Sequence, residues 1–182
     1  MRYIINADQS RLTVKAIARG LLSTFAHSPT LTARGLSGEV EFDPVAPEAS
    51  LVRLSVRADS LEVVDNKISE ADRHEIERKT REEVLEAVRY PEIVFQSVKV
   101  STERTGEGHY RIRLSGELLL HGVKHTQTIE AGVQLDENCL RARGESTLRQ
   151  SEYRIKPVTA LGGAIKLKDE LEVVFDINAC SL

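Results

Sequence analysis

Two histidines, His121 and His125, lie four residues apart, a spacing that would suit a metal site. On a helix, residues four apart share one face, so two imidazoles could bind the same ion. Here the flanking residues alternate as they do in a strand, and the pair spans a strand end and a turn. We therefore expect His121 to hydrogen-bond the backbone of this corner, and we predict no metal site.

Two other motifs resemble catalytic sites without completing them. His74 and Glu75 begin like the HExxH motif of zinc proteases, but Arg78 stands at the second histidine position. His27 and Ser28 could be a base and a nucleophile, yet neighbours in a strand point apart and no Gly-x-Ser-x-Gly elbow surrounds the serine. We expect a capping role for His27 or Ser28, and a solvated helix face or a place near the mouth of the fold for His74. We predict no catalytic residue.

The remaining candidates for chemistry are two cysteines and a basic loop. Cys139 and Cys180 are the only cysteines, and neither has a CxxC spacing or a nearby histidine cluster, so a zinc site is not indicated. We expect two reduced, packed thiols. The basic loop contains Arg149, Tyr153, Arg154 and Lys156. These residues could meet a phosphate or quinone headgroup, although the favoured interpretation is a solvated loop.

Composition excludes several classes of protein. The 182 residues include 25 basic and 28 acidic side chains, a formal net charge of -3, and no Trp. Such a chain offers neither the basic surface nor the stacking platforms that nucleic-acid binding uses. No segment approaches the ~20 apolar residues that a membrane-spanning helix needs. We expect one domain over residues 1–182, soluble and cytoplasmic unless a leader has been removed.

Alternation of apolar and polar residues predicts an all-β fold. The clearest stretch is Tyr110 to Val133, where two alternating limbs flank a corner at His121 and Gly122. In all we expect eight strands: Arg11 to Ala18, Leu31 to Asp43, Ser50 to Ala58, Ile93 to Ser101, Tyr110 to Leu120, Thr126 to Leu135, Cys139 to Leu148 and Ala164 to Cys180. Long antiparallel strands in this number favour an up-and-down barrel, which leaves no exposed sheet edge.

Two short segments interrupt the strands. Leu21 to Phe25 has helical or 3₁₀ spacing. Between Leu61 and Tyr90 the sequence is charged and favours one or two helices, with Ser69 as the N-cap. One apolar stripe of this insertion comprises Ile76, Thr80, Val84 and Val88. We expect the insertion to pack over the sheet, to present the charged run 70–83 to solvent, and to end at Tyr90, before a proline.

Several stretches, in order along the chain, resemble the YceI-like family of lipocalin-like, isoprenoid-binding proteins. The matching stretches are GEVEFDP at 38–44, PEAS at 47–50, ADSL at 58–61, YPEIVFQS at 90–97, GELLLHGV at 116–123 and KDEL at 168–171. The resemblance implies an extended eight-stranded antiparallel lipocalin-like barrel, often dimeric, whose lumen holds a long isoprenoid or other fatty chain. Family patterns differ at 71–76 and 124–127, and many members carry a leader to the periplasm.

Side chains on the lumen face decide whether such a barrel is hollow. Many candidates on the inward parity are small, which would leave space for a ligand; the alternative is that they relieve crowding between bent strands. An apolar tunnel gains about 25 cal/mol per Å² of ligand surface removed from water. The predicted ligand-binding residues, in the lumen or at its mouth, are Val14, Ala16, Ala18, Phe25, Phe42, Val56, Phe95, Leu118, Ala142, Tyr153 and Phe175.

Three hypotheses of different classes follow. The first is a carrier that sequesters an isoprenoid, an isoprenoid quinone or a fatty-acid-like amphiphile, without cofactor or covalent chemistry; a homodimer is implied by the resemblance alone. The second is an enzyme acting on an apolar substrate, with His27, His74, His121 or His125 as acid or base. The third is a solid barrel whose charged helix binds a protein partner. We favour the carrier and expect no enzymatic activity.

Overall fold

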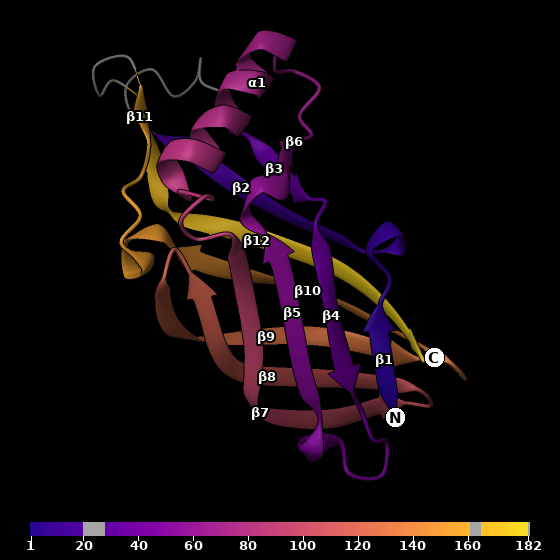
Figure 1. Ribbon diagram of the computed structural model, residues 1–182. Helices are drawn as coiled ribbons and strands as arrows, with labels where there is room; N and C mark the ends of the chain where they lie inside the picture. The colour runs from indigo at the N-terminus through magenta and orange to yellow at the C-terminus, as the bar shows by residue number, and fades with distance from the viewer. Residues whose placement is uncertain (20–27, 161–164, 182) are drawn as a thin grey trace.

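The computed structural model describes residues 1–19, 28–160 and 165–181, and most of these residues lie in one antiparallel sheet (Figure 1). The segment Leu21 to Phe25, for which helical or 3₁₀ structure was predicted, lies outside these ranges, and so does His27. The strands are β1 (Arg2–Ile5), β2 (Arg11–Arg19), β3 (Thr30–Ala33), β4 (Leu36–Glu41), β5 (Leu51–Arg57), β6 (Leu61–Val63), β7 (Glu92–Gly106), β8 (His109–Leu120), β9 (Val123–Leu135), β10 (Cys139–Arg149), β11 (Thr159–Ala160) and β12 (Ile165–Ser181).

The sheet closes on itself as an eight-stranded barrel, which confirms the predicted fold. Strand β12 pairs with β10 along one edge and with β2 and then β1 along the other. Three wall strands are interrupted, and each consists of two short strands: β1 with β2, β3 with β4, and β5 with β6. The β3/β4 couple lies between the other two, because β4 pairs with β1 and β5 while β3 pairs with β2 and β6. The other five wall strands are β7, β8, β9, β10 and β12.

Short irregularities produce these interruptions. Between β1 and β2, the Asn6 side chain accepts hydrogen bonds from two backbone N–H groups of a 3₁₀ turn. Between β3 and β4 lies Gly35, where an added Cβ would come within 2.9 Å of the Arg57 Cβ, so only glycine allows this close approach. Strand β1 was not predicted, because its four residues carry little periodicity.

The corner between β8 and β9 is a tight turn, as predicted. His121 and Gly122 both have positive φ, 50° and 72°, as a type I′ hairpin turn requires. This turn type matches the twist of the flanking strands, which then pair over their full length from Leu120 opposite Val123 to His109 opposite Gln134.

One helix lies across an end of the barrel (Figure 1). Helix α1 (Glu70–Lys79) continues as a π-helical turn over Thr80–Val84. The predicted N-cap is confirmed, since the Ser69 hydroxyl oxygen accepts a hydrogen bond from the Asp72 N–H at 3.2 Å. The predicted end of the insertion at Tyr90 is wrong: helical structure stops at Val84. Val88 is fully exposed and does not extend the apolar stripe, because a residue of positive φ, Glu86, turns the chain first.

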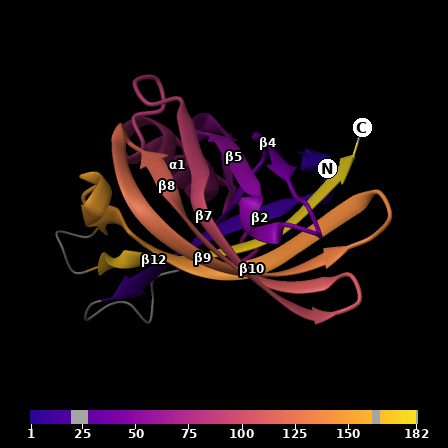
Figure 2. The same ribbon diagram turned by 90° about the horizontal axis from the view of Figure 1, so that it is seen from below.

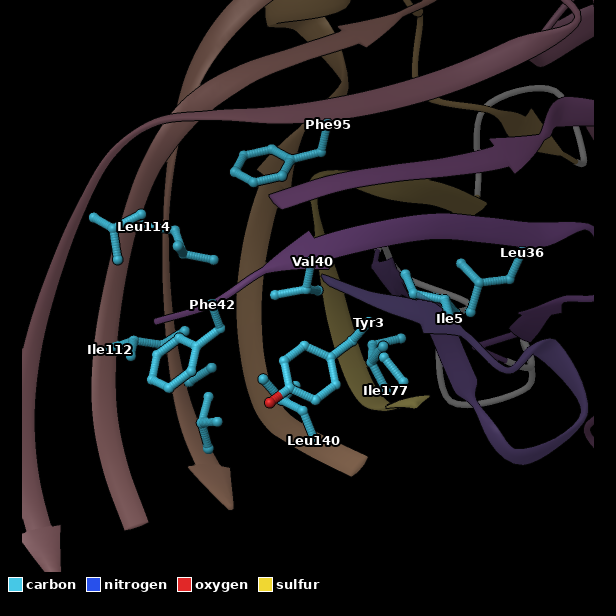
Figure 3. Close-up of a cluster of buried hydrophobic side chains, with 14 of the residues drawn as sticks. Tyr3, Ile5, Leu36, Val40, Phe42, Phe95, Ile112, Leu114, Leu140 and Ile177 are labelled. Atoms are coloured by element: carbon cyan, nitrogen blue, oxygen red, sulfur yellow. The ribbon is translucent and has the colours of Figure 1, made fainter. Parts of the chain in front are cut away.

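Buried side chains gather at the opposite end of the barrel (Figure 3). Tyr3 is 1% exposed and Phe42 is 4% exposed, and the Phe42 ring meets the Tyr110 ring edge-on at 5.2 Å between centroids. These aromatic residues come from three separate segments of the chain, so their contacts tie the N-terminal strands to the β7–β8 hairpin.

The cysteines are bonded to one another, so the prediction of reduced thiols is wrong. Cys139 and Cys180 stand directly opposite in the β10–β12 ladder and form a disulfide. Each residue ends its strand, and only the long-range register brings them together. Disulfides are rare in cytosolic proteins, so this bond weighs against the expected cytoplasmic location, which stays a prediction.

Thiol titration tests the disulfide. The protein is expected to contain no free thiol when it is unfolded without a reducing agent. After reduction it is expected to contain two free thiols. Replacing both cysteines by serine is expected to lower the free energy of unfolding by about 2–4 kcal/mol, because the bond restricts the unfolded chain. Urea unfolding of the double variant measures this loss; equal stability of variant and wild type would contradict the role.

A pH titration tests the ion cluster on the outer face of β10 and β12. Hydrogen bonds from Arg141 above all, and from Arg143, lower the pKa of Asp176 below its ordinary 3.8. A lowered folded-state pKa stabilises the fold above the unfolded pKa, and this contribution is lost as the pH falls through the folded pKa. Asp176→Asn is expected to lower stability by up to about 1 kcal/mol at pH 7. The difference in stability between wild type and Asp176→Asn should shrink below pH 3.8. Asp8→Asn is the control variant.

Candidate functional site

The barrel encloses a cavity of about 600 Å³. Its volume falls within the range typical of small-molecule sites, roughly 300–1,000 Å³. The wall is overwhelmingly apolar, with contributions from all eight wall strands, among them Leu12, Val14, Val40, Val52, Leu54, Phe95, Ile112, Ile129, Ala142 and Phe175. The lumen is therefore not filled by its own side chains, which argues against small residues serving only to relieve crowding.

The floor of the cavity is formed by one cluster of buried side chains that contains Tyr3, Phe42 and Tyr110. Tyr3 and Phe42 are labelled in Figure 3. Burial raises the pKa of the Tyr3 phenol. Phe42 itself lines the cavity, whereas Tyr3 and Tyr110 lie behind the lining. This end is closed by apolar contacts and is suited to the tail of a ligand.

The mouth of the cavity lies under α1. Ile76 and Val84 face inward there, and their neighbours Asp72, Glu75 and Lys79 also line the opening. The charged run was predicted to face solvent; these three residues are exposed, as expected, and they rim the mouth as well. A hydrogen bond from the Arg78 guanidinium lowers the pKa of Glu75 below its ordinary value.

Two glycines keep the lumen open. A Cβ at Gly144 would lie 2.6 Å from the Phe175 Cζ, and one at Gly116 would lie 2.7 Å from the Phe95 Cζ. Each phenyl ring therefore lies over a glycine of the neighbouring strand, flat against the wall, where a side chain would push it into the cavity. Alternation predicted both glycines on the inward face, but not the rings that cover them.

Most of the predicted ligand-binding residues lie on the cavity wall, although their contact with a ligand stays a prediction. Those that line the cavity are Val14, Ala16, Phe42, Val56, Phe95, Leu118, Ala142 and Phe175. Ala18 is on β2 but is not part of the lining, and its N–H donates to the Ser28 hydroxyl oxygen at 3.2 Å. Phe25 lies outside the described residues. The bond between Ala18 and Ser28 joins β2 to the residues before β3, and among the described residues Ser28 caps no helix.

Tyr153 lies behind the wall and not on it. Its side chain is fully buried in a second apolar cluster with Leu85, Leu120 and Ile155. The Gln127 Nε2 donates a hydrogen bond to the Tyr153 hydroxyl at 2.9 Å, and burial raises the pKa of this phenol. Tyr153 therefore does not belong to an exposed basic cluster. It contacts the cavity lining through its hydrogen bond with Gln127.

His121 fastens the segment after α1 to the barrel. Its Nε2 lies 2.6 Å from the Glu86 Oε2, and its Nδ1 lies 3.2 Å from the Tyr153 backbone oxygen. The expected hydrogen bond from His121 to backbone is present. Its partner is the backbone oxygen of Tyr153, however, and not the backbone of the corner itself. His125 is exposed and makes no contact with His121, and the described residues hold no cluster of three or more His, Cys, Asp or Glu placed for a metal.

No helix among residues 1–19, 28–160 and 165–181 is long and apolar enough to span a membrane. No curated protein matches the sequence. Several solved structures share the fold at low identity, among them the following three. BcnA of Burkholderia cenocepacia superposes with a TM-score of 0.73 at 15% identity, over 96% of this chain and 98% of that one.

A polyisoprenoid binding domain from Saccharophagus degradans superposes with a TM-score of 0.71 at 12% identity, covering 99% of this chain and 98% of that one. The YCEI protein of Campylobacter jejuni gives a TM-score of 0.60 at 14% identity, over 84% of both chains. A sequence model of the YceI-like domain matches residues 3–179, nearly the whole chain. The protein therefore belongs to the YceI-like family.

Proposed function

We propose that the protein binds one amphiphile with a long apolar chain in the barrel lumen and thereby sequesters or carries it. The ligand is an isoprenoid, an isoprenoid quinone or a fatty-acid-like molecule. The observation that carries this proposal is the apolar cavity of about 600 Å³, closed by aromatic side chains at one end and rimmed by polar groups under α1. The description of the Saccharophagus relative as polyisoprenoid-binding supports it.

Burial of apolar surface is the main source of free energy for such binding. A chain that loses about 400 Å² of apolar surface gains on the order of 10 kcal/mol at about 25 cal/mol per Å². Association costs roughly 4–15 kcal/mol, so shape and a preformed cavity decide the affinity. Strand pairing around the closed barrel holds the wall in place and supplies such a cavity.

One valine on the cavity wall and one on the outer face offer a matched test. Val173 lines the cavity, whereas Val98 on β7 is 74% exposed and is not part of the lining. Val173→Trp is expected to fill the lumen and to weaken binding of geranylgeraniol at least ~10-fold, the equivalent of about 1.4 kcal/mol. Val98→Trp is expected to leave it unchanged.

Displacement of a neutral dye, N-phenyl-1-naphthylamine, measures both affinities. Melting curves of the two variants separate loss of binding from loss of folding. Equal binding by the two tryptophan variants would place the ligand outside the lumen.

The enzymatic alternative has no support from the described residues. It would use one of four histidines as acid or base. Of these, His121 is engaged on both ring nitrogens, His74 and His125 are exposed and away from the lining, and His27 lies outside the described range. The structure gives His121 a structural task instead.

Alanine substitutions separate the two roles of histidine. His121→Ala is expected to lower the free energy of unfolding by about 1–3 kcal/mol, because it removes a charge-assisted bond to Glu86. His125→Ala, at an exposed site, is expected to change it by less than about 0.5 kcal/mol. Urea unfolding measures both. Loss of turnover of a lipid-like substrate in His125→Ala, with its fold intact, would favour an enzyme instead.

A further inference from the structure

The barrel wall is split between β9 and β10. Their pairing runs from the connecting turn only as far as Glu130 opposite Glu145. On their outer edges, β9 stays paired with β8 to Val123, and β10 stays paired with β12 to Arg149. Beyond the two glutamates, the facing edges therefore have no strand partner among the described residues. Figure 2 shows the strands side by side at their turn and apart at the other end.

Charge and packing account for the split. Glu130 and Glu145 stand directly opposite on the outer face, and like charges in this position destabilise strand pairing. Arg113 neutralises Glu130 at 2.6 Å, but Glu145 has no ion pair within the described part of the chain. Farther along, the 3₁₀ turn that carries Tyr153 follows β10, and its phenol is hydrogen-bonded to Gln127 on β9. The strands are thus held apart by a defined structure.

The lumen reaches this gap. A recess on the outer face shares Gln127, Ala131, Ser146, Thr147 and Val173 with the lining of the lumen, so the same side chains border both spaces. With Gln150, the three polar residues of this set form a polar patch on the β9–β10 side of the described lining. The other polar lining residues are Ser50, Asp72, Glu75, Lys79 and Thr80, and all but Ser50 belong to the helical segment at the mouth.

Part of the hydrogen-bonding capacity of this patch is unused. The Gln127 Nε2 donates to Tyr153, and the Gln150 Nε2 donates to the Lys168 backbone oxygen. The Gln127 side-chain oxygen has no partner among the described residues. The Ser146 hydroxyl reaches only the Thr147 backbone oxygen, at 3.5 Å, the outer limit of a hydrogen bond. The Gln127 side-chain oxygen and the Ser146 hydroxyl are therefore available to a ligand.

We infer that the gap between β9 and β10 binds the polar headgroup of the amphiphile, and that this headgroup is a neutral hydroxyl or carbonyl, as in an alcohol, phenol or quinone. The inference rests on the proposed lumen function. A carboxylate or phosphate is disfavoured because the polar side chains of this patch are all uncharged and offer no cation to an anionic headgroup. The charges around the outer rim balance one another: Arg141 and Arg143 share Asp176, which leaves one positive charge to offset Glu145, and Arg111, Glu130 and Glu172 are each paired with an opposite charge.

Substitution at the gap tests the headgroup position. We compare geranylgeraniol with the saturated hydrocarbon of the same chain by displacement of N-phenyl-1-naphthylamine. In the Gln127→Leu/Ser146→Ala variant, the preference for the alcohol over the hydrocarbon is expected to fall ~10-fold, the loss of one or two hydrogen bonds. Ser146→Ala alone, which leaves the bond to Tyr153 intact, is expected to lose ~3-fold. Thr80→Val probes the competing headgroup position at the mouth under α1 and is expected to keep the alcohol preference. Ser101→Ala, at an exposed position of β7 outside both linings, is the matched control and should change nothing.

Each outcome separates the two proposals. Failure of the wild-type protein to bind dye, alcohol and hydrocarbon would overturn the lumen function itself. Normal binding with an alcohol preference that falls only in Thr80→Val would place the headgroup under α1 and overturn this inference alone. An alcohol preference unchanged in every variant would overturn it as well.

A charge substitution tests the headgroup class. At pH 7, geranylgeranoic acid is expected to bind wild-type protein at least ~5-fold more weakly than the alcohol, and Glu145→Gln should narrow that gap. Glu137→Gln, in the exposed turn between the strands, is the control. An acid that binds more tightly than the alcohol would overturn the assignment of a neutral headgroup.

Discussion

The whole structure depends on one strand that is paired along both edges. β12 receives β10 on one side and the two N-terminal strands on the other, and this double pairing turns a sheet into a closed barrel. Closure removes the exposed edges of an open sheet and gives every wall strand an inner face. The disulfide between Cys139 and Cys180 fastens the same seam at its end, beside the pairing with β1. Without this seam there would be no enclosed lumen.

Closure also explains why the interior can stay empty. An eight-stranded barrel is wide enough to be filled by its own side chains or to hold one ligand, and the inner residues decide between these outcomes. Here the glycines on β8 and β10 let two phenylalanine rings lie against the wall, while leucines, isoleucines and valines supply most of the remaining surface. The aromatic cluster blocks one end, and α1 with the segment fastened by His121 covers the other. The result is a directional cavity.

Local patterns in the sequence predict the elements of this fold well. Alternation identified the eight wall strands, the break in alternation at His121 and Gly122 identified a hairpin turn, and Ser69 identified the start of the helix. These features depend on neighbouring residues alone, and so does the inward parity that placed Ala142 and Phe175 on the cavity wall.

Features that depend on long-range register were not predictable in this way. Cys139 and Cys180 meet because β10 and β12 pair in one particular register, and Glu86 reaches His121 only after the chain has turned out of the helix. The β9–β10 ladder ends where Glu130 faces Glu145, a pairing that no local pattern reveals. Tyr153 was expected near a ligand, but packing of the following segment buries it behind the wall.

The most direct test of the account is mass spectrometry of the organic extract of protein purified from its native host, run beside native mass spectrometry of the intact complex. The account predicts a single class of amphiphile with a long apolar chain and a neutral headgroup, present at up to one molecule per chain. An intact mass equal to that of the protein alone, with an empty extract and no uptake of added isoprenoid or fatty compounds, would contradict it.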